Sequence, residues 1–175
     1  MSNASRKVKE LMVKITDYPH IPYWMSMRDA IAMMHSVYDQ EAGLGENRMI
    51  LIFDENYQLM GVLRLRNLLI GIEPKFLRRD EKSPYQGLRH ADYAGLSALV
   101  EGTFTSKCKE EAAKPVSEVL TPIIATVDVN DSVSKAAFIM LQADINLMPV
   151  MDGEKVAGVL RMSDVFNELT KIVIE

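Results

Sequence analysis

The side chains best suited to chemistry in this sequence are two arginines that end the same four-residue sequence. Residues 61–64 and residues 158–161 both read Gly-Val-Leu-Arg. A guanidinium offers a planar set of N–H donors that can bind a phosphate or a carboxylate through two hydrogen bonds. Arg64 and Arg161 would therefore suit a di- or triphosphate, or another bridging anion, if the fold brings them together. The alternative is that both lie on exposed strand positions and pair with surface carboxylates.

No other set of residues forms a recognisable catalytic or metal-binding group. His20, His35 and His90 are scattered without a ligand partner at a useful spacing, and Cys108, the only cysteine, lies among charged residues. The sequence has no Ser-His-Asp order, no phosphate-binding Walker loop and no GxGxxG motif. We therefore expect no catalytic residue, no metal site and no required cofactor, and we expect that the protein is not an enzyme.

The two arginines belong to a repeat that extends over most of the chain. Residues 8–12 correspond to residues 116–120, an offset of 108, whereas the two glycines before the arginines differ by 97. Extra residues in the first copy, mostly within residues 38–46, account for the difference of 11. This pattern is typical of two copies of one unit. Because repeated units usually pack against each other, the seam between the copies is the natural place for a ligand.

The first copy contains signals for a helix followed by two strands. Apolar residues at helical spacing begin at Met27, behind Ser26 and Asp29, which resemble a helix cap with a reciprocal acidic partner. Residues 49–53 form a continuous apolar run suited to a buried strand. Residues 59–65 follow as a second strand after turn-forming residues, and a short helix follows the second strand.

The second copy repeats this order. Asp131 is expected to cap a helix, and residues 147–151 and 156–162 are expected to form strands on either side of an Asp-Gly hairpin turn. Ser163 or Asp164 then opens the last helix. The repeated unit is therefore helix, strand, strand, helix, with a short extended piece before it.

These signals divide the chain into four segments. Residues 1–7 form a tail that includes a possible tag remnant, residues 8–72 form the first repeat, and residues 113–175 form the second. Residues 73–112 form a connector with helical segments. The connector is interpreted as a long solvated linker with one packed helix, or as a regulatory arm or dimer clasp, because connections of this length are often functional.

Composition sets limits on the partners. The 175 residues are 48% apolar, which is enough for one sizeable core or two small cores that share an interface. The formal net charge of −4 argues against nucleic acid as the main partner. The apolar runs are too short to span a bilayer, and the N-terminus lacks an apolar secretory segment, so no membrane association is expected and the expected location is the cytoplasm.

This arrangement resembles a tandem pair of cystathionine-β-synthase (CBS) domains. In that family each copy begins with a valine-led apolar segment, here residues 8–12 and 116–120, and the strand at residues 148–152 also looks typical. Each copy ends with glycine, two apolar residues, threonine or serine, two further residues and aspartate, which correspond to residues 61–67 and 158–164. The resemblance covers all of the chain except the connector. It implies an α+β fold of two βαββα-type CBS repeats, packed through their sheets as a pseudo-twofold module.

The resemblance also implies a sensor rather than a catalyst. Clefts between CBS copies often bind adenosine-containing ligands, so AMP, ADP, ATP or a related compound is the expected regulatory ligand. In this interpretation Asp164 accepts both ribose hydroxyls, and Ser163 offers phosphate a hydroxyl at a helix N-terminus. Ile124, Ala125, Met148 and Val150 are the apolar residues expected to form the adenine slot, and Pro149 lies between the last two.

The sequence departs from the family pattern in two ways. Arginine replaces the threonine or serine in both copies, and the pseudo-twofold packing would bring Arg64 and Arg161 toward the central cleft. Asn67 replaces the aspartate of the first copy, and an amide is a weaker acceptor that also donates. We therefore expect one good nucleoside site at Asp164 and one degraded or empty site at Asn67.

Two functions remain open at this stage. The first is a stand-alone regulatory module that binds an adenosyl ligand and signals to a downstream protein that the sequence does not identify. The second is a ligand-free dimerisation or scaffold protein, in which exposed apolar residues of the last helix (Val165, Phe166 and Leu169) carry self-association. A homodimer is the expected assembly.

Overall fold

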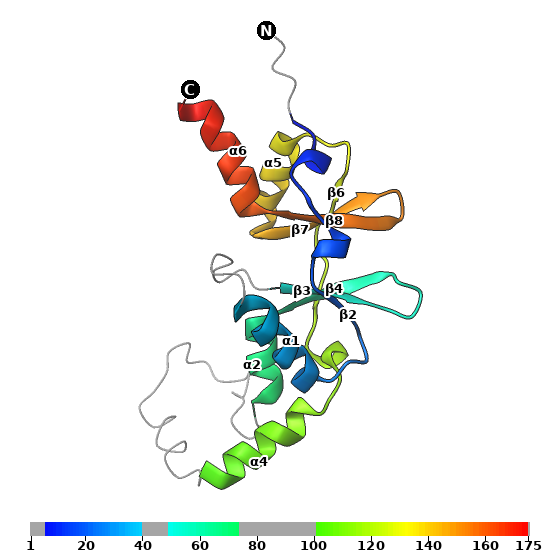
Figure 1. Cartoon of the computed structure of the whole chain (residues 1–175), viewed down its shortest axis with the longest axis vertical. Helices are drawn as coiled ribbons and strands as arrows, with labels where there is room; N and C mark the ends of the chain where they lie inside the picture. The colour runs from blue at the N-terminus through cyan, green and yellow to red at the C-terminus, as the bar shows by residue number, and fades with distance from the viewer. Residues whose placement is uncertain (1–5, 40–48, 74–100, 175) are drawn as a thin grey trace, which may run out of the picture.

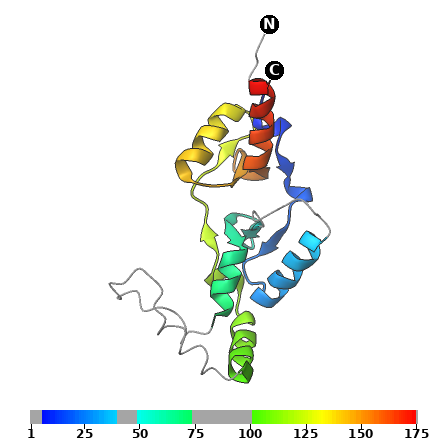
Figure 2. The same cartoon turned by 90° about the vertical axis from the view of Figure 1, so that its left-hand side faces the viewer.

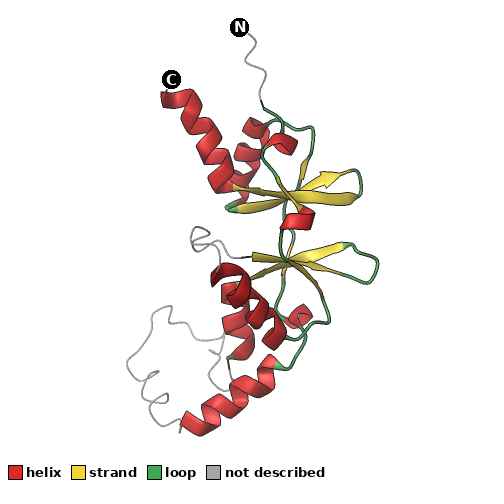
Figure 3. Cartoon of the chain, in the orientation of Figure 1, coloured by secondary structure: helices red, strands yellow, loops and turns green. Residues whose placement is uncertain are grey.

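The computed structural model describes residues 6–39, 49–73 and 101–174. Most of the expected insertion of the first copy, most of the connector and His90 lie outside the described residues. Within the described ranges the chain forms two stacked units, each with one four-stranded sheet (Figure 1). The sheets face each other in the middle and the helices cover their outer faces (Figure 3).

Both units contain the helix, strand, strand, helix order that the sequence predicts. The first unit contains β2 (His20–Pro22), α1 (Met27–Asp39), β3 (Met49–Phe53), β4 (Leu59–Arg64) and α2 (Leu65–Ile72). The second contains β6 (Val127–Asp128), α5 (Val133–Ala143), β7 (Leu147–Asp152), β8 (Lys155–Arg161) and α6 (Met162–Ile174).

The strand registers confirm that the two units are copies. Strand β2 runs parallel to β3 with Ile21 opposite Ile52, and β6 runs parallel to β7 with Val127 opposite Val150. Each antiparallel hairpin pairs the second of these residues with a glycine, and each changes register immediately after that pair. The 11-residue drift in the sequence therefore leaves the strand pairing unchanged.

Each sheet is completed by a strand that precedes the other unit in the sequence. Strand β1 (Val13–Lys14) pairs antiparallel with β8, and β5 (Thr121–Pro122) pairs antiparallel with β4. The sheet orders are therefore β1-β8-β7-β6 and β2-β3-β4-β5. Figure 2 shows the N-terminal segment in blue beside the unit that contains α5 and α6. The sequence analysis missed this exchange, because the order of elements along the chain does not show which sheet a two-residue strand joins.

The segments before the exchanged strands also cross over. Val8 begins the short helix η1 (Val8–Glu10) and is fully buried in the core of the second unit. Val116 begins the equivalent helix η4 (Val116–Glu118) and is fully buried in the core of the first unit. The backbone N–H of Val8 donates to Asp131 O at 2.9 Å, and that of Val116 donates to Met25 O at 2.8 Å. Each unit therefore contributes part of the core of the other.

A glycine lies where each exchanged strand pairs with the sheet of the other unit. A Cβ atom on Gly61 would lie 2.5 Å from the backbone oxygen of Thr121, and one on Gly158 would lie even closer to the backbone oxygen of Val13. The obstacle is backbone in both cases, so a flexible side chain cannot move aside to make room. The repeated glycine is therefore required by the close approach of the exchanged strand.

The two sheets pack face to face through a continuous apolar layer, as expected. Residues from β3 and β4 meet residues from β7 and β8 in one cluster that is buried on both sides. Separate clusters fill the space between each sheet and its helices. The buried members of the layer between the sheets are Met49, Leu51, Phe53, Val62, Leu147 and Val159.

The helix caps agree only in part with the sequence analysis. Ser26 Oγ accepts from the backbone N–H of Asp29 at 3.1 Å and donates to the Asp29 carboxylate at 2.7 Å, which confirms the predicted cap of α1. The predicted cap of α5 is wrong, because Ser132 Oγ rather than Asp131 accepts the N–H of Lys135. Asp131 instead accepts from Lys135 Nζ at 2.8 Å, and this hydrogen bond lowers the pKa of the Asp131 carboxyl.

The described end of the connector is a packed helix. Helix α4 (Glu101–Ala112) lies against α2 and α1, and Arg28 of α1 donates to the backbone oxygen of Lys109 at 3.3 Å. Glu111 is buried and pairs with Lys114 at 2.6 Å. The described part of the connector thus contains a packed helix, which ends at Ala112.

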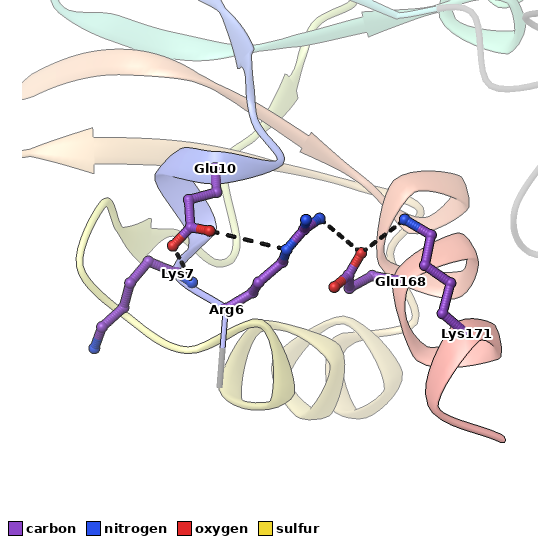
Figure 4. Close-up of polar contacts among 5 residues, drawn as sticks. All are labelled: Arg6, Lys7, Glu10, Glu168 and Lys171. Atoms are coloured by element: carbon purple, nitrogen blue, oxygen red, sulfur yellow. Dashed lines mark hydrogen bonds and ion pairs between the residues drawn. The ribbon is translucent and has the colours of Figure 1, made fainter. Parts of the chain in front are cut away.

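An ion-pair network attaches the N-terminal segment to the last helix (Figure 4). Arg6 Nη1 lies 2.9 Å from Glu168 Oε2, and Lys171 Nζ lies 3.2 Å from the same oxygen. Arg6 Nε also lies 3.9 Å from Glu10 Oε2. The arginine and lysine are largely exposed, so the network contributes at most modestly to stability, but it holds α6 beside the segment that carries β1.

The glycine contacts lead to a first prediction. We expect Gly158→Ala to lower the free energy of unfolding by about 2–3 kcal/mol, because the added methyl group must displace the backbone of β1. Urea denaturation followed by circular dichroism measures the change. Gly153→Asn is the matched control, since nothing lies within 4 Å of a Cβ there and its φ of +60° is one that asparagine tolerates. An equal loss in both variants would contradict a specific role for the strand crossing.

Candidate functional site

The two arginines occupy equivalent places at the ends of the central strands. Arg64 is the last residue of β4 and lies opposite Met49, and Arg161 is the last residue of β8 and lies opposite Leu147. A helix begins immediately after each of them. Figures 1 and 2 show α2 and α6 leaving the seam on the same side of the sheets and running away from each other. The two helix N-termini, with their free N–H groups, therefore flank the seam.

In the second unit the arginine is paired with the predicted ribose carboxylate. Arg161 Nε donates to Asp164 Oδ2 at 2.7 Å, and Arg161 Nη2 donates to Asp164 Oδ1 at 2.9 Å. Side-chain exposure is 33% for the arginine and 19% for the aspartate. Each carboxylate oxygen thus accepts a charge-assisted hydrogen bond from a neighbour three residues away. The i, i+3 spacing was a signal for this contact that the sequence analysis did not use.

In the first unit the equivalent residues make different contacts. Asn67 Oδ1 accepts the backbone N–H of Arg64 at 2.8 Å, and Asn67 Nδ2 donates to Thr121 Oγ1 at 3.1 Å. Asn67 therefore joins the start of α2 to the exchanged strand β5. The Nε atom of Arg64 is buried and has no hydrogen-bond partner among the described residues. Asn67 thus does not offer Arg64 the carboxylate that Asp164 offers Arg161.

The predicted adenine-slot residues lie in different environments. Ile124 is 67% exposed, and Ala125 packs at the edge of the core beneath α5 and α6. Met148 and Val150 are fully buried inside that core. The expectation that their side chains line an open slot is therefore corrected, because alternate residues of β7 point toward the helices. Pro149 lies between them, opposite Val159 of the layer between the sheets.

Ser163 is exposed in the first turn of α6, beside the Arg161–Asp164 pair. The helix begins at Met162, one residue earlier than predicted. The structure thus brings Arg161, Ser163 and Asp164 into one short segment at the seam, with a positive charge, a hydroxyl and a carboxylate. Such a set can bind a ligand that carries both hydroxyl groups and an anion.

An apolar groove of about 180 Å³ lies away from the seam, on the helical face of the first unit. It is lined by residues of α1 and α2: Ile31, Met34, His35, Leu65, Leu68, Leu69 and Ile72. The sequence analysis did not predict this groove. It follows from the 3.6-residue spacing of apolar side chains on two adjacent helices.

Across residues 6–39, 49–73 and 101–174, no group of three or more histidine, cysteine, aspartate or glutamate side chains could hold a metal ion. In the same ranges, no helix combines the length and the apolar character needed to cross a membrane.

Comparison with known proteins identifies the fold. Residues 116–171 match the CBS domain family, and no curated protein matches the chain. The structure of CBSX2 in complex with AMP is 20% identical, covers 95% of this chain and 97% of that one, and has a TM-score of 0.59. A CBS domain-containing protein from Kribbella flavida is 14% identical over 94% of this chain and 98% of that one, with a TM-score of 0.67.

A third similar structure is the cytosolic domain of the Mg²⁺ channel MgtE in complex with ATP. It is 17% identical, with 86% of this chain and 44% of that one covered and a TM-score of 0.54. The chain therefore spans less than half of the length of that domain, and it spans 48% of the soluble part of a magnesium transporter. At these identities the likeness shows a shared fold.

The different contacts of the two arginines lead to a second prediction. We expect Asn67→Asp to raise the free energy of unfolding by about 0.5–1 kcal/mol at pH 7, because the new carboxylate can accept from Arg64 as Asp164 does from Arg161. The reciprocal variant, Asp164→Asn, should lower stability by a similar amount. Urea denaturation at two salt concentrations measures both changes.

The gain from Asn67→Asp depends on pH in a defined direction. An ion pair lowers the folded-state pKa of a carboxyl, so the gain is present above its unfolded pKa and is lost as the pH falls through the folded value. A variant that is no more stable than the parent at pH 7 would contradict the inference that the Arg64 Nε atom lacks an acceptor in the parent.

Proposed function

Because residues 116–171 belong to the CBS domain family and the whole chain has the fold of a tandem CBS pair, we propose that it is a non-catalytic regulatory module. It binds an adenosine-containing ligand such as AMP, ADP or ATP at the seam between its two units, and it signals to a partner protein. The main support for this proposal is that residues suited to ribose and to phosphate lie together at the start of α6. Asp164 supplies a carboxylate for ribose, and Arg161 and Ser163 supply donors for phosphate.

Two similar structures support the choice of ligand class. One contains AMP and another contains ATP, and they match the fold over 95% and 86% of this chain. The segment itself supports the same class, because the N-terminus of α6 favours an anion.

Signalling requires that the ligand favour one arrangement of the protein over another. The exchange between the units supports such coupling, because each unit contributes residues to the core of the other. A ligand that binds between α2 and α6 therefore acts on elements that both units share.

The exposed helix faces support a homodimer as the assembled form. Of the three residues of the last helix expected to carry self-association, only Phe166 is exposed, at 65%, because Val165 is buried in the core and Leu169 packs against it. The equivalent of Phe166 in the first unit, Leu69 of α2, is 58% exposed. Phe138 and Leu141 of α5 are also exposed. Apolar faces in equivalent places on both units can be buried by a second copy related by a twofold axis. This feature also favours the second candidate function, a scaffold that dimerises without a ligand.

A thermal-shift series with AMP, ADP, ATP, S-adenosylmethionine and NADH separates the two functions. A ligand that binds only the folded state stabilises it by about 2.7 kcal/mol at 100 times its Kd, which raises the Tm by roughly 5–10 °C for a chain of this size. We expect Asp164→Ala to abolish this shift and Asn67→Ala to reduce it less. Glu154→Ala, in the exposed hairpin turn of the second unit, is the control and should leave the shift unchanged. No shift with any compound would favour the scaffold.

The homodimer is tested independently of any ligand. We expect Phe166→Glu to convert the protein to a monomer in sedimentation equilibrium, because burial of a charged residue in the shared apolar face is costly. Trp24→Glu is the control, since Trp24 is similarly exposed, at 56%, but lies in the turn before α1. If both variants remain dimeric, the helix faces are not the interface. If the parent protein is monomeric, the homodimer is wrong.

A further inference from the structure

The two units differ in the segment that leads into the parallel edge strand of each sheet. Ile21 of β2 and Val127 of β6 occupy equivalent register positions. The residue three places before each of them is Tyr18 in the first unit and Ile124 in the second. Ile124 is 67% exposed, whereas Tyr18 is partly buried and packs against the apolar layer between the sheets. The first unit therefore places an aromatic ring at the seam where the second unit has a residue that faces solvent.

The Tyr18 side chain reaches the end of the first sheet at which Arg64 lies. Its hydroxyl donates to the backbone oxygen of Met49 at 3.1 Å, and Met49, the first residue of β3, pairs with Arg64. Leu147 pairs with Arg161 in the same way in the second unit. The Nε atom of Arg64 is buried, whereas the Arg161 side chain is 33% exposed. The tyrosine thus lies in the first unit where the proposed function puts a nucleoside in the second.

A connected set of contacts holds the backbone of Tyr18. His20 Nδ1 lies 2.9 Å from the backbone oxygen of Tyr18, and since a carbonyl oxygen only accepts, this nitrogen carries the proton and donates. His20 Nε2 then accepts from the Tyr57 hydroxyl at 2.9 Å. Tyr57 in turn stacks on Phe53, with the ring centroids 4.5 Å apart. These contacts tie the segment that carries Tyr18 to the hairpin between β3 and β4.

The backbone of Tyr57 is strained in this hairpin. Its φ is +59°, in the left-handed region that bulky side chains rarely adopt, whereas the hairpin of the second unit has a glycine, Gly153, at φ +60°. A strained residue persists only where its surroundings hold it there. The stack on Phe53 and the hydrogen bond to His20 are such surroundings. The strain therefore indicates that the contacts behind Tyr18 are a built feature of the first unit.

We propose that the Tyr18 ring fills the base-binding place of the first unit, so that the chain binds one nucleotide, at the Asp164 end of the seam. A phenol ring and a nucleobase are both flat groups that bury apolar faces and form hydrogen bonds at their edges, so one excludes the other from the same space. This inference rests on the proposed function, because it concerns the equivalent place in the other unit. It goes further by assigning the loss of the second site to a ring that fills it rather than to the amide of Asn67.

The stoichiometry of nucleotide binding to the full chain tests the inference. Isothermal titration calorimetry uses whichever of AMP and ATP binds more tightly to the parent. We expect one nucleotide per parent chain, and still one per chain in Asn67→Asp, because the ribose cannot reach the new carboxylate while the ring is in place. In the double variant Tyr18→Ala/Asn67→Asp we expect two, since removal of the ring opens the space beside that carboxylate.

Tyr23→Ala/Asn67→Asp is the matched control. Tyr23 is also a partly buried tyrosine of the first unit, but it packs against the core on the helical side of the sheet. Its removal leaves the seam unchanged, so this variant should bind one nucleotide per chain. Two nucleotides in the control would overturn the assignment to Tyr18.

The outcomes separate this inference from the proposed function. Two nucleotides per chain in the parent or in Asn67→Asp would overturn the role of Tyr18 and leave the proposed function standing. One nucleotide in the double variant with Tyr18→Ala would do the same. If neither AMP nor ATP binds to the parent or to any variant, the proposed function is overturned and the inference with it.

A crystal structure of the unmodified chain with the same nucleotide covers the case in which the Tyr18→Ala variant does not fold. At a saturating concentration we expect one nucleotide beside Asp164, with the Tyr18 hydroxyl still on the backbone oxygen of Met49. A base against Met49 in place of the Tyr18 ring would overturn the inference. A nucleotide at neither place would overturn the proposed function and the inference together.

Discussion

The close approach of two exchanged strands sets the geometry of this protein. At Gly61 and Gly158 the backbone of a strand from the other unit occupies the space that a side chain would need. Each sheet therefore gains its fourth strand from the segment that precedes the other unit. Val8 and Val116 extend this exchange into the cores, where both are fully buried. Neither unit is complete alone, so the relative placement of the two sheets is fixed by the same contacts that complete them.

Because the exchanged strands fix the two sheets relative to each other, they also fix the positions of the residues at the seam. The strands β4 and β8 end on the same side of the stacked sheets, and a helix N-terminus follows each. The backbone repeats closely, so the side chains at equivalent positions determine how the two ends differ. In one unit an arginine meets an aspartate, and in the other an arginine stands beside an asparagine that bonds to the backbone and to Thr121. The ends of β4 and β8 therefore have equivalent backbones but differ in the charge of the side chain that lies beside each arginine.

Much of the local structure could be predicted from the sequence because it depends on neighbouring residues. The cap formed by Ser26 and Asp29 was predicted correctly, since a capping box is a contact between residues three positions apart. The cap of α5 was assigned one residue too early, because Asp131 and Ser132 are both good capping residues and only the backbone path chooses between them. Periodicity gave the type of each element more reliably than its first residue.

Within the candidate site, the sequence determined which residue types are available, and the repeat determined that they come in two equivalent sets. Their spacing along the chain was enough to place Arg161, Ser163 and Asp164 in one segment. Only the tertiary structure decided that Met148 and Val150 face the helices, and that β1 and β5 cross between the sheets. The physical reason is that a strand of two residues carries too little pattern to choose its partner, so long-range backbone pairing and burial make the choice.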